Sequence, residues 1–154
     1  MIDVFHCEGW KTVFHKKSSG GSAKCNAVRS GDQQDVLWVA VFEILSDEKR
    51  NLDYAEGRGK GYHEEWTHKT LSGGKVKGLM YIADTAVIDD TLKPYDWYKE
   101  MVVFGAKYHE FPVDYIDDIQ KIECISDDYS ARADKKWKIV DEMKSVNDDL
   151  HQRD

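Results

Sequence analysis

The chain has 154 residues, which is enough for one compact domain and too few for two of ordinary size. Its 22 basic and 29 acidic residues give a formal net charge of −7, which argues against a nucleic-acid partner, because such a protein needs a basic face for the phosphates. No apolar run approaches the roughly 20 residues of a membrane span, and the start lacks a signal-peptide pattern. We therefore expect a cytoplasmic protein that does not associate with membranes.

Strand patterns dominate the first half of the sequence. Residues 11–15, which include Val13 and Phe14, predict a strand, and a polar loop follows them. Residues 36–42 are apolar at odd and even positions alike, which predicts a strand buried on both faces. Residues 62–69 alternate like a strand, and residues 76–83 return after a turn at 72–75, which predicts a hairpin.

A short helix is predicted between the apolar strand and the hairpin. Ser46 is the expected N-cap residue, and acidic residues follow it in the first turn, where the helix dipole favours negative charge. Gly57 is the expected C-cap, since glycine readily adopts the left-handed conformation that ends many helices. The next glycines, Gly59 and Gly61, do not complete a dinucleotide fingerprint, because the spacing and the order of helix and strand are wrong.

Helical patterns dominate the second half. Pro94 fits the first position of a helix that continues through residues 95–104, with Gly105 as its stop. Apolar stripes at helical spacing predict two further helices, one after Pro112 and one near the end of the chain. The acidic pair Asp127-Asp128 is expected in a solvated loop. Strands first and helices later indicate a mixed α+β fold.

The three cysteines argue against disulfide and metal chemistry. Cys7, Cys25 and Cys124 are an odd number, lie far apart and lack paired short spacing. Disulfide frameworks and zinc sites prefer even sets at close spacing. We therefore expect reduced, mostly buried thiols, with no metal site.

One carboxylate is a candidate for chemistry. Glu56 lies in the last turn of the predicted short helix, where the negative end of the helix dipole raises the pKa of a carboxyl group. Desolvation by nearby aromatic rings would raise that pKa further, as a general acid/base requires. On the residues alone, an exposed glutamate at a helix end without a catalytic role stays an open alternative.

The order of short motifs over roughly residues 3–128 resembles the γ-glutamylcyclotransferase family. Residues 14–18 and 24–27 look like the bacterial branch of that family. In chain order, the motifs that carry the resemblance are Leu52-Asp53-x-x-Glu56-Gly57, Gly61-Tyr62, Tyr81, Tyr98-Lys99 running into Gly105-Ala106-Lys107, and Phe111-Pro112-x-x-Tyr115.

The resemblance implies a small mixed β-barrel flanked by helices, with neither cofactor nor metal. It implies an enzyme that releases 5-oxoproline from small-molecule γ-glutamyl amides by intramolecular cyclisation, with Glu56 as general acid/base. Tyr62, Tyr81 and Tyr98 match family positions that bind substrate. For each tyrosine, a structural role in the core with a satisfied hydroxyl stays open.

One family feature is missing from this sequence. The family begins with a strand that runs into a Tyr-Gly-Ser-Asn turn, whose backbone N–H groups hold the glutamyl end of the substrate. We therefore expect an N-terminally incomplete domain at residues 1–128 and a charged helix or tail at 129–154. The alternative function is a non-catalytic or truncated family member that acts as a binding or assembly module. An absent strand would expose the edge of residues 36–42, which predicts a homodimer.

Overall fold

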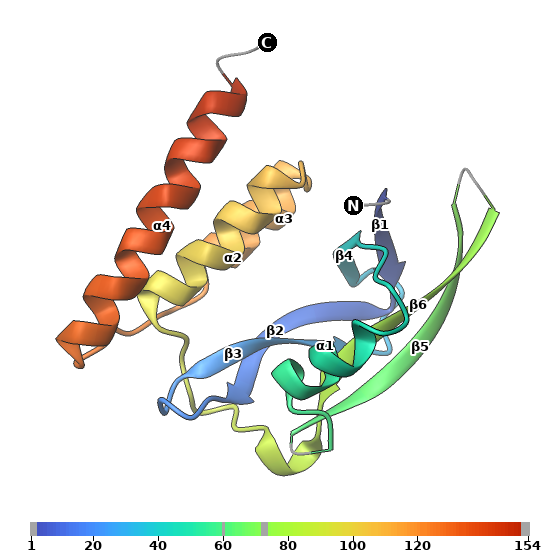
Figure 1. The fold of residues 1–154 in the computed structure, drawn as a ribbon, viewed down its shortest axis with the longest axis horizontal. Helices are drawn as coiled ribbons and strands as arrows, with labels where there is room; N and C mark the ends of the chain where they lie inside the picture. Colours follow the sequence, from blue (N-terminus) through green and yellow to red (C-terminus); the bar gives the residue numbers. More distant parts are fainter. Residues whose placement is uncertain (1–2, 60, 72–73, 152–154) are drawn as a thin grey trace. The chain divides into compact units, whose positions relative to one another are not determined.

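The structure is a computed structural model that describes residues 3–59, 61–71 and 74–151. The chain forms two compact units (Figure 1). The first comprises Met1–Lys17 and Cys25–Asp90, and the second comprises Ser18–Lys24 and Thr91–Asp154. Strands dominate the first unit and helices the second, so the predicted α+β fold is confirmed.

The apolar strand predicted at residues 36–42 is present as β4 (Val36–Val41), and a strand from the start of the chain pairs with it. Strand β1 (Asp3–Glu8) pairs with it in antiparallel register, from Asp3 opposite Val41 to Glu8 opposite Val36. The expectation that this strand is buried on both faces is wrong. Within β4 only Leu37 is buried, and the next residue, Phe42, is 55% exposed.

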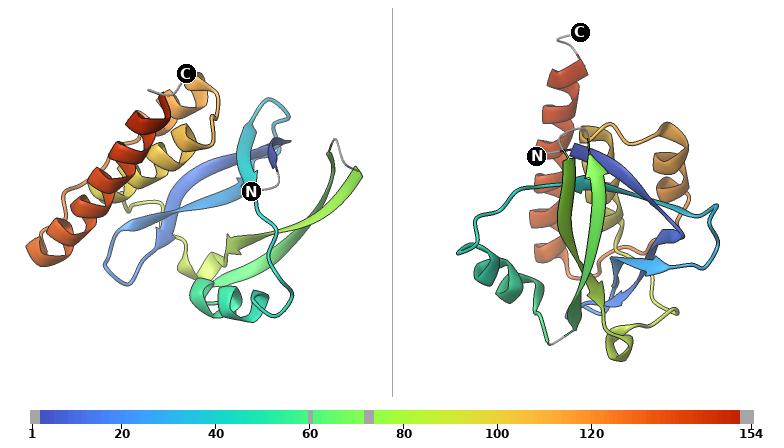
Figure 2. Two further views of the ribbon diagram at one scale, coloured as in Figure 1. Left: turned by 45° about the horizontal axis from the view of Figure 1, so that its top comes forward. Right: turned by 90° about the vertical axis from the view of Figure 1, so that its right-hand side faces the viewer.

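The other described strands form two more two-stranded sheets. Strand β2 (Trp10–Lys17) pairs with β3 (Ala23–Arg29), and β5 (Tyr62–Leu71) pairs antiparallel with β6 (Gly74–Ala83). The long β5–β6 ribbon is visible in both views of Figure 2 and confirms the predicted hairpin, although residues 72–73 of its turn lie outside the described residues. The described strands thus form three two-stranded sheets and do not close into the expected barrel.

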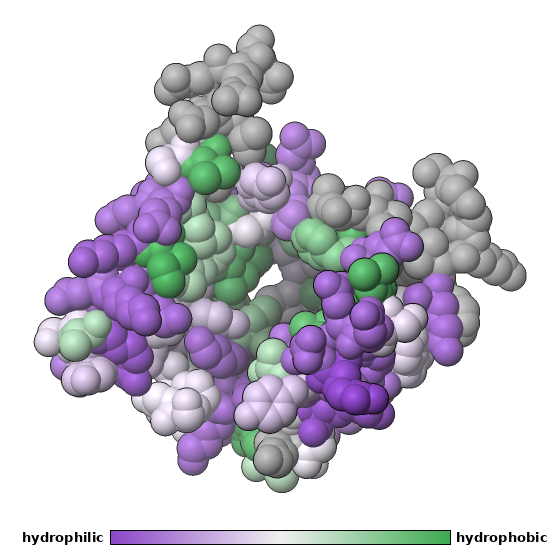
Figure 3. Space-filling model, viewed as in Figure 1, coloured by the Kyte–Doolittle hydropathy of each residue, from purple (hydrophilic) through white to green (hydrophobic). Residues whose placement is uncertain are grey.

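Helix α1 (Lys49–Glu56) follows β4 and precedes β5. The prediction of Ser46 as N-cap is wrong, because the helix begins after Glu48 and no side chain caps it. Gly57 is confirmed as the C-cap, with a φ of 67°. Hydrophilic side chains gather over α1 on the face shown in Figure 3. A short 3-10 helix, η1 (Thr85–Val87), follows β6.

The second unit contains three helices in its described residues, α2 (Asp96–Tyr108), α3 (Val113–Gln120) and α4 (Ser130–His151). Helix α2 packs against both α3 and α4. Its core consists of side chains from all three helices. These residues are Trp97, Val103, Ala106, Ile116, Ile119 and Val140. None of the helices in the described part of the chain is long and apolar enough to cross a bilayer.

Both predicted ends of α2 are wrong. The helix does not begin at Pro94, because Tyr95 is extended, with φ −66° and ψ 145°, and forms a parallel β-bridge with Ile125. It also continues through Gly105 to Tyr108, since a single glycine costs a helix interior only about 1 kcal/mol.

A buried ion pair stabilises the second unit. The side chain of Asp127 is 0% exposed and accepts hydrogen bonds from Arg132 Nε and Nη2, both at 2.6 Å, and from Trp97 Nε1 at 3.0 Å. The Arg132 hydrogen bonds are the main reason that the pKa of Asp127 falls to about 2. The expectation that Asp127 is solvated is therefore wrong, because hydrogen bonds from Arg132, five residues later, compensate for the burial of its charge.

Candidate active site

Helix α1 ends in a backbone motif that fixes the position of Glu56. The N–H of Gly57 donates to the carbonyl of Tyr54 at 3.1 Å, and the N–H of Arg58 donates to the carbonyl of Asp53 at 2.9 Å. This pair of hydrogen bonds is a Schellman motif, which requires the left-handed conformation that Gly57 adopts. Glu56 is therefore the last helical residue, and it is half-buried.

The chain after this motif returns Tyr62 to the end of the helix. The N–H of Gly59 donates to the carbonyl of Tyr62 at 2.9 Å, and the N–H of Asp84 donates to the carbonyl of Gly61 at 3.0 Å. Gly61 is buried with a φ of 150°, and a Cβ there would contact the Val87 side chain at 3.6 Å. Glycine is therefore required at this position by backbone conformation.

The structure brings Glu56 and Tyr62 together. The pKa of the half-buried Tyr62 phenol is raised, first by burial and then by the negative charge of Glu56. The Glu56 carboxylate thus lies close enough to act on this phenol electrostatically. Tyr62 consequently remains protonated at neutral pH and can donate a hydrogen bond.

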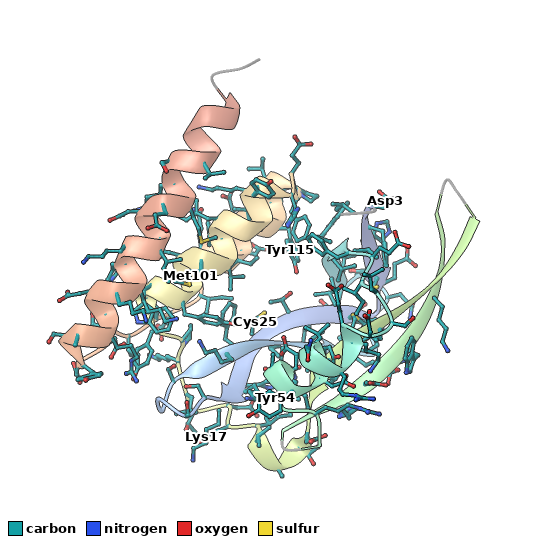
Figure 4. All side chains as sticks on the ribbon, in the orientation of Figure 1. Asp3, Lys17, Cys25, Tyr54, Met101 and Tyr115 are labelled. Carbon is teal, nitrogen blue, oxygen red and sulfur yellow. The ribbon has the colours of Figure 1, made fainter. Side chains whose placement is uncertain are left out.

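Two further side chains border Tyr62. The ammonium group of Lys16, on β2, lies 4.5 Å from the centre of the Tyr62 ring. Cys25, labelled in Figure 4 and located on β3, is the other neighbour. Burial raises the pKa of the Cys25 thiol to about 12, so this thiol stays protonated at neutral pH and is a poor nucleophile.

Tyr81, on β6, belongs to a hydrogen-bonded network rather than to a free pocket wall. Its hydroxyl donates to Oδ1 of Asp53 at 2.6 Å, and Lys49 Nζ donates to the same oxygen at 2.8 Å. Lys49 and Arg58 both pair with Glu64, with Arg58 Nε 3.0 Å from the carboxylate. Burial and the hydrogen bond to Asp53 raise the pKa of Tyr81 to about 12.

Tyr98 belongs to the second unit, where it lies on α2. The ammonium group of Lys24 is 3.6 Å from the centre of its ring, and the Trp97 ring packs edge-on against it at 6.0 Å. Of the predicted site residues, the structure thus places Glu56, Tyr62 and Tyr81 in the first unit and Tyr98 in the second.

An open cleft of about 650 Å³ lies on the first unit. Glu56 is not among the residues that line it, whereas Tyr62 is, together with the exposed ring of Tyr54. In the cleft, His63 Nδ1 lies 2.8 Å from Asp84 Oδ1.

The sequence did not predict a role for this pair or for Lys16. The alternation of residues 62–69 indicated only which side chains share a face of the strand, so it gave no sign of these contacts.

The fold and this site together define a mixed α+β protein in which a carboxylate at a helix end acts electrostatically on a half-buried phenol. The sequence profile of the AIG2-like family matches residues 36–119, more than half of the chain. The protein therefore belongs to the AIG2-like family. No curated protein matches the sequence.

Two solved structures share the fold. The crystal structure of the uncharacterized human protein LOC79017 is 19% identical, with a TM-score of 0.74 over 90% of this chain and 83% of that chain. A structure of gamma-glutamyl cyclotransferase is 18% identical, with a TM-score of 0.72 over 91% of this chain and 83% of that chain. The predicted γ-glutamylcyclotransferase-like fold is thereby confirmed.

Proposed function

We propose that the protein is a γ-glutamylcyclotransferase-like enzyme that releases 5-oxoproline from γ-glutamyl amides, with Glu56 as general acid/base. The observation that carries this proposal is the position of Glu56, which a Schellman motif fixes at the helix end, where its charge acts on the Tyr62 phenol. Membership of the AIG2-like family and the fold shared with a gamma-glutamyl cyclotransferase support the same activity.

The proposed reaction needs two proton transfers that one carboxylate can serve. The α-amino nitrogen of the substrate attacks the γ-carbonyl carbon and closes a five-membered ring, and the bond to the leaving nitrogen then breaks. Glu56 accepts a proton from the attacking nitrogen and returns one to the leaving amine, so no proton is gained or lost. The protonated Tyr62 phenol is a hydrogen-bond donor for the carbonyl oxygen as negative charge develops on it.

The tyrosines take different parts in this proposal. Tyr62 contacts the reacting groups, whereas Tyr81 holds Asp53 in the helical turn that precedes Glu56. Substrate contacts of Tyr81 and Tyr98 rest on the family resemblance.

The decisive experiment measures 5-oxoproline by mass spectrometry after incubation with a panel of γ-glutamyl amides. Glu56→Gln should lower turnover by about two to four orders of magnitude, as expected for loss of a general acid/base. The control is Glu43→Gln, a change of the same chemistry at an exposed position before α1, which should leave turnover unchanged. No release by the wild type refutes the activity, and unchanged turnover in Glu56→Gln removes Glu56 from the mechanism.

A binding or assembly module is the second candidate, and one observation favours it. The cleft of about 650 Å³ is lined by neighbours of Glu56 in sequence but not by Glu56 itself. A ligand that binds this cleft without being converted would support the second candidate. Its binding should then weaken on Arg58→Gln and be unaffected by Glu56→Gln.

A further inference from the structure

We propose that Lys16 binds the α-carboxylate of the substrate's glutamyl end, beside Glu56 and Tyr62. This inference rests on the proposed function and names the group that orients the substrate there. The anion-binding role thus falls to a side chain on β2. Neither the family motifs nor the strand pattern had predicted a function for Lys16.

The first observation is that the position of Lys16 is fixed. Lys16 is half-buried, and its backbone forms an antiparallel bridge with Ile88. Its Cε lies 3.8 Å from where a Cβ at Gly61 would be, so its aliphatic stem packs against the Gly61 backbone. The Lys16 stem therefore runs alongside Gly61 where its ammonium group reaches over the Tyr62 ring.

The second observation is the charge at the end of that stem. The Lys16 ammonium lies over the face of the Tyr62 ring, and no carboxylate of the described residues forms an ion pair with it within 4.0 Å. Lys49, by contrast, pairs with two carboxylates. A half-buried cation gains more from an anionic partner than an exposed one does, because solvent screens it less.

The third observation is the arrangement of opposite charges around Tyr62. Lys16 lies over the face of the ring, and the negative charge of Glu56 acts on its phenol hydroxyl. An α-amino acid head group carries one negative and one positive charge on neighbouring atoms. With its carboxylate on Lys16, its nitrogen is directed toward Glu56, the group that has to take its proton.

The test compares Lys16→Gln, Lys16→Arg and the control Lys17→Gln. Lys17, labelled in Figure 4, is the next residue of β2 and is exposed, and successive strand residues point to opposite faces. The substrates are a γ-glutamyl amide and the matching 4-aminobutanoyl amide, which lacks the α-carboxylate and cyclises to 2-pyrrolidinone.

For the γ-glutamyl amide, Lys16→Gln should raise KM by about 10- to 100-fold, the loss expected for one hydrogen bond to a charged group. The value of kcat should change far less, Lys16→Arg should recover most of the loss, and Lys17→Gln should match the wild type. For the 4-aminobutanoyl amide, all four proteins should have similar kcat/KM. An equal loss with both substrates, or no loss with either, overturns the proposal.

A binding measurement separates this inference from the proposed function. The affinity of 5-oxoproline, which keeps the carboxylate, is measured by calorimetry for the wild type and for both glutamine variants, after circular dichroism has established that each is folded. Weaker binding to Lys16→Gln alone supports the carboxylate site even if the wild type shows no turnover, a result that would refute only the activity. No binding to the wild type, or equal binding to all three proteins, overturns the role of Lys16.

Discussion

The hydroxyl of Tyr81 donates a 2.6 Å hydrogen bond to the carboxylate of Asp53, three residues before Glu56. The carbonyl of Asp53 also accepts the N–H of Arg58 in the Schellman motif. Strand β6 is therefore bonded to the same residue whose backbone closes the end of α1. This connection couples the hairpin to the position of the candidate catalytic carboxylate.

Tyr81→Phe should loosen the end of α1 without removing any apolar contact. We expect faster hydrogen exchange at the Gly57 and Arg58 amides and about a tenfold lower kcat/KM, because a small displacement of a catalytic group is costly. The control is Tyr108→Phe, which removes an equivalent hydroxyl from an exposed ring in the second unit. Equal exchange rates in both variants would contradict the coupling.

Gly57→Ala and Gly105→Ala should change stability in opposite directions. Alanine at Gly57 has to adopt a φ of 67°, which costs about 1–2 kcal/mol. Alanine at Gly105 meets no atom within 4 Å inside α2 and should stabilise the protein by up to about 1 kcal/mol. Thermal unfolding measures both effects, and only Gly57→Ala should also lower 5-oxoproline release. A stabilised Gly57→Ala variant would refute the assigned C-cap.

Asp127 should make stability depend on pH in the acid range. Its pKa falls from an ordinary 3.8 to about 2 in the folded chain, so the unfolded chain binds the proton first as the pH decreases. The stabilising contribution is complete above pH 3.8 and is lost as the pH approaches 2. The free energy of unfolding should therefore fall more steeply between pH 4 and 2 in the wild type than in Asp127→Asn. The exposed neighbour provides the control, because Asp128→Asn should keep the wild-type slope.

The predicted homodimer should depend on Phe42. Strand β1 covers one edge of β4, and Phe42 just beyond β4 is 55% exposed. We expect light scattering at low micromolar concentration to give twice the 17.8 kDa mass of one chain. Phe42→Glu should reduce it to the monomer, whereas Val113→Glu, at an exposed apolar position of the second unit, should not. A monomeric wild type would refute the dimer.

The sequence alone was sufficient where short-range interactions decide the structure. Gly57 ends α1 because its conformational freedom is a property of that one residue, and the hairpin follows from the alternation of residues 62–69 and the turn at 72–75 that precedes residues 76–83. The same local pattern predicts that Glu56 lies in the last turn of a helix, so the sequence alone identifies the candidate carboxylate.

Only the tertiary structure decided features that depend on partners far along the chain. Residues 3–8 have no clear alternation, and β1 is defined by its pairing with β4 more than 25 residues later. Asp127 is buried against Trp97, 30 residues earlier in the chain, and helix α2 starts late because Ile125 holds Tyr95 extended. Likewise, the position of Lys16 over Tyr62 joins two strands, β2 and β5. A local pattern records the preference of each residue, whereas burial and ion pairing depend on which distant groups the folded chain brings together.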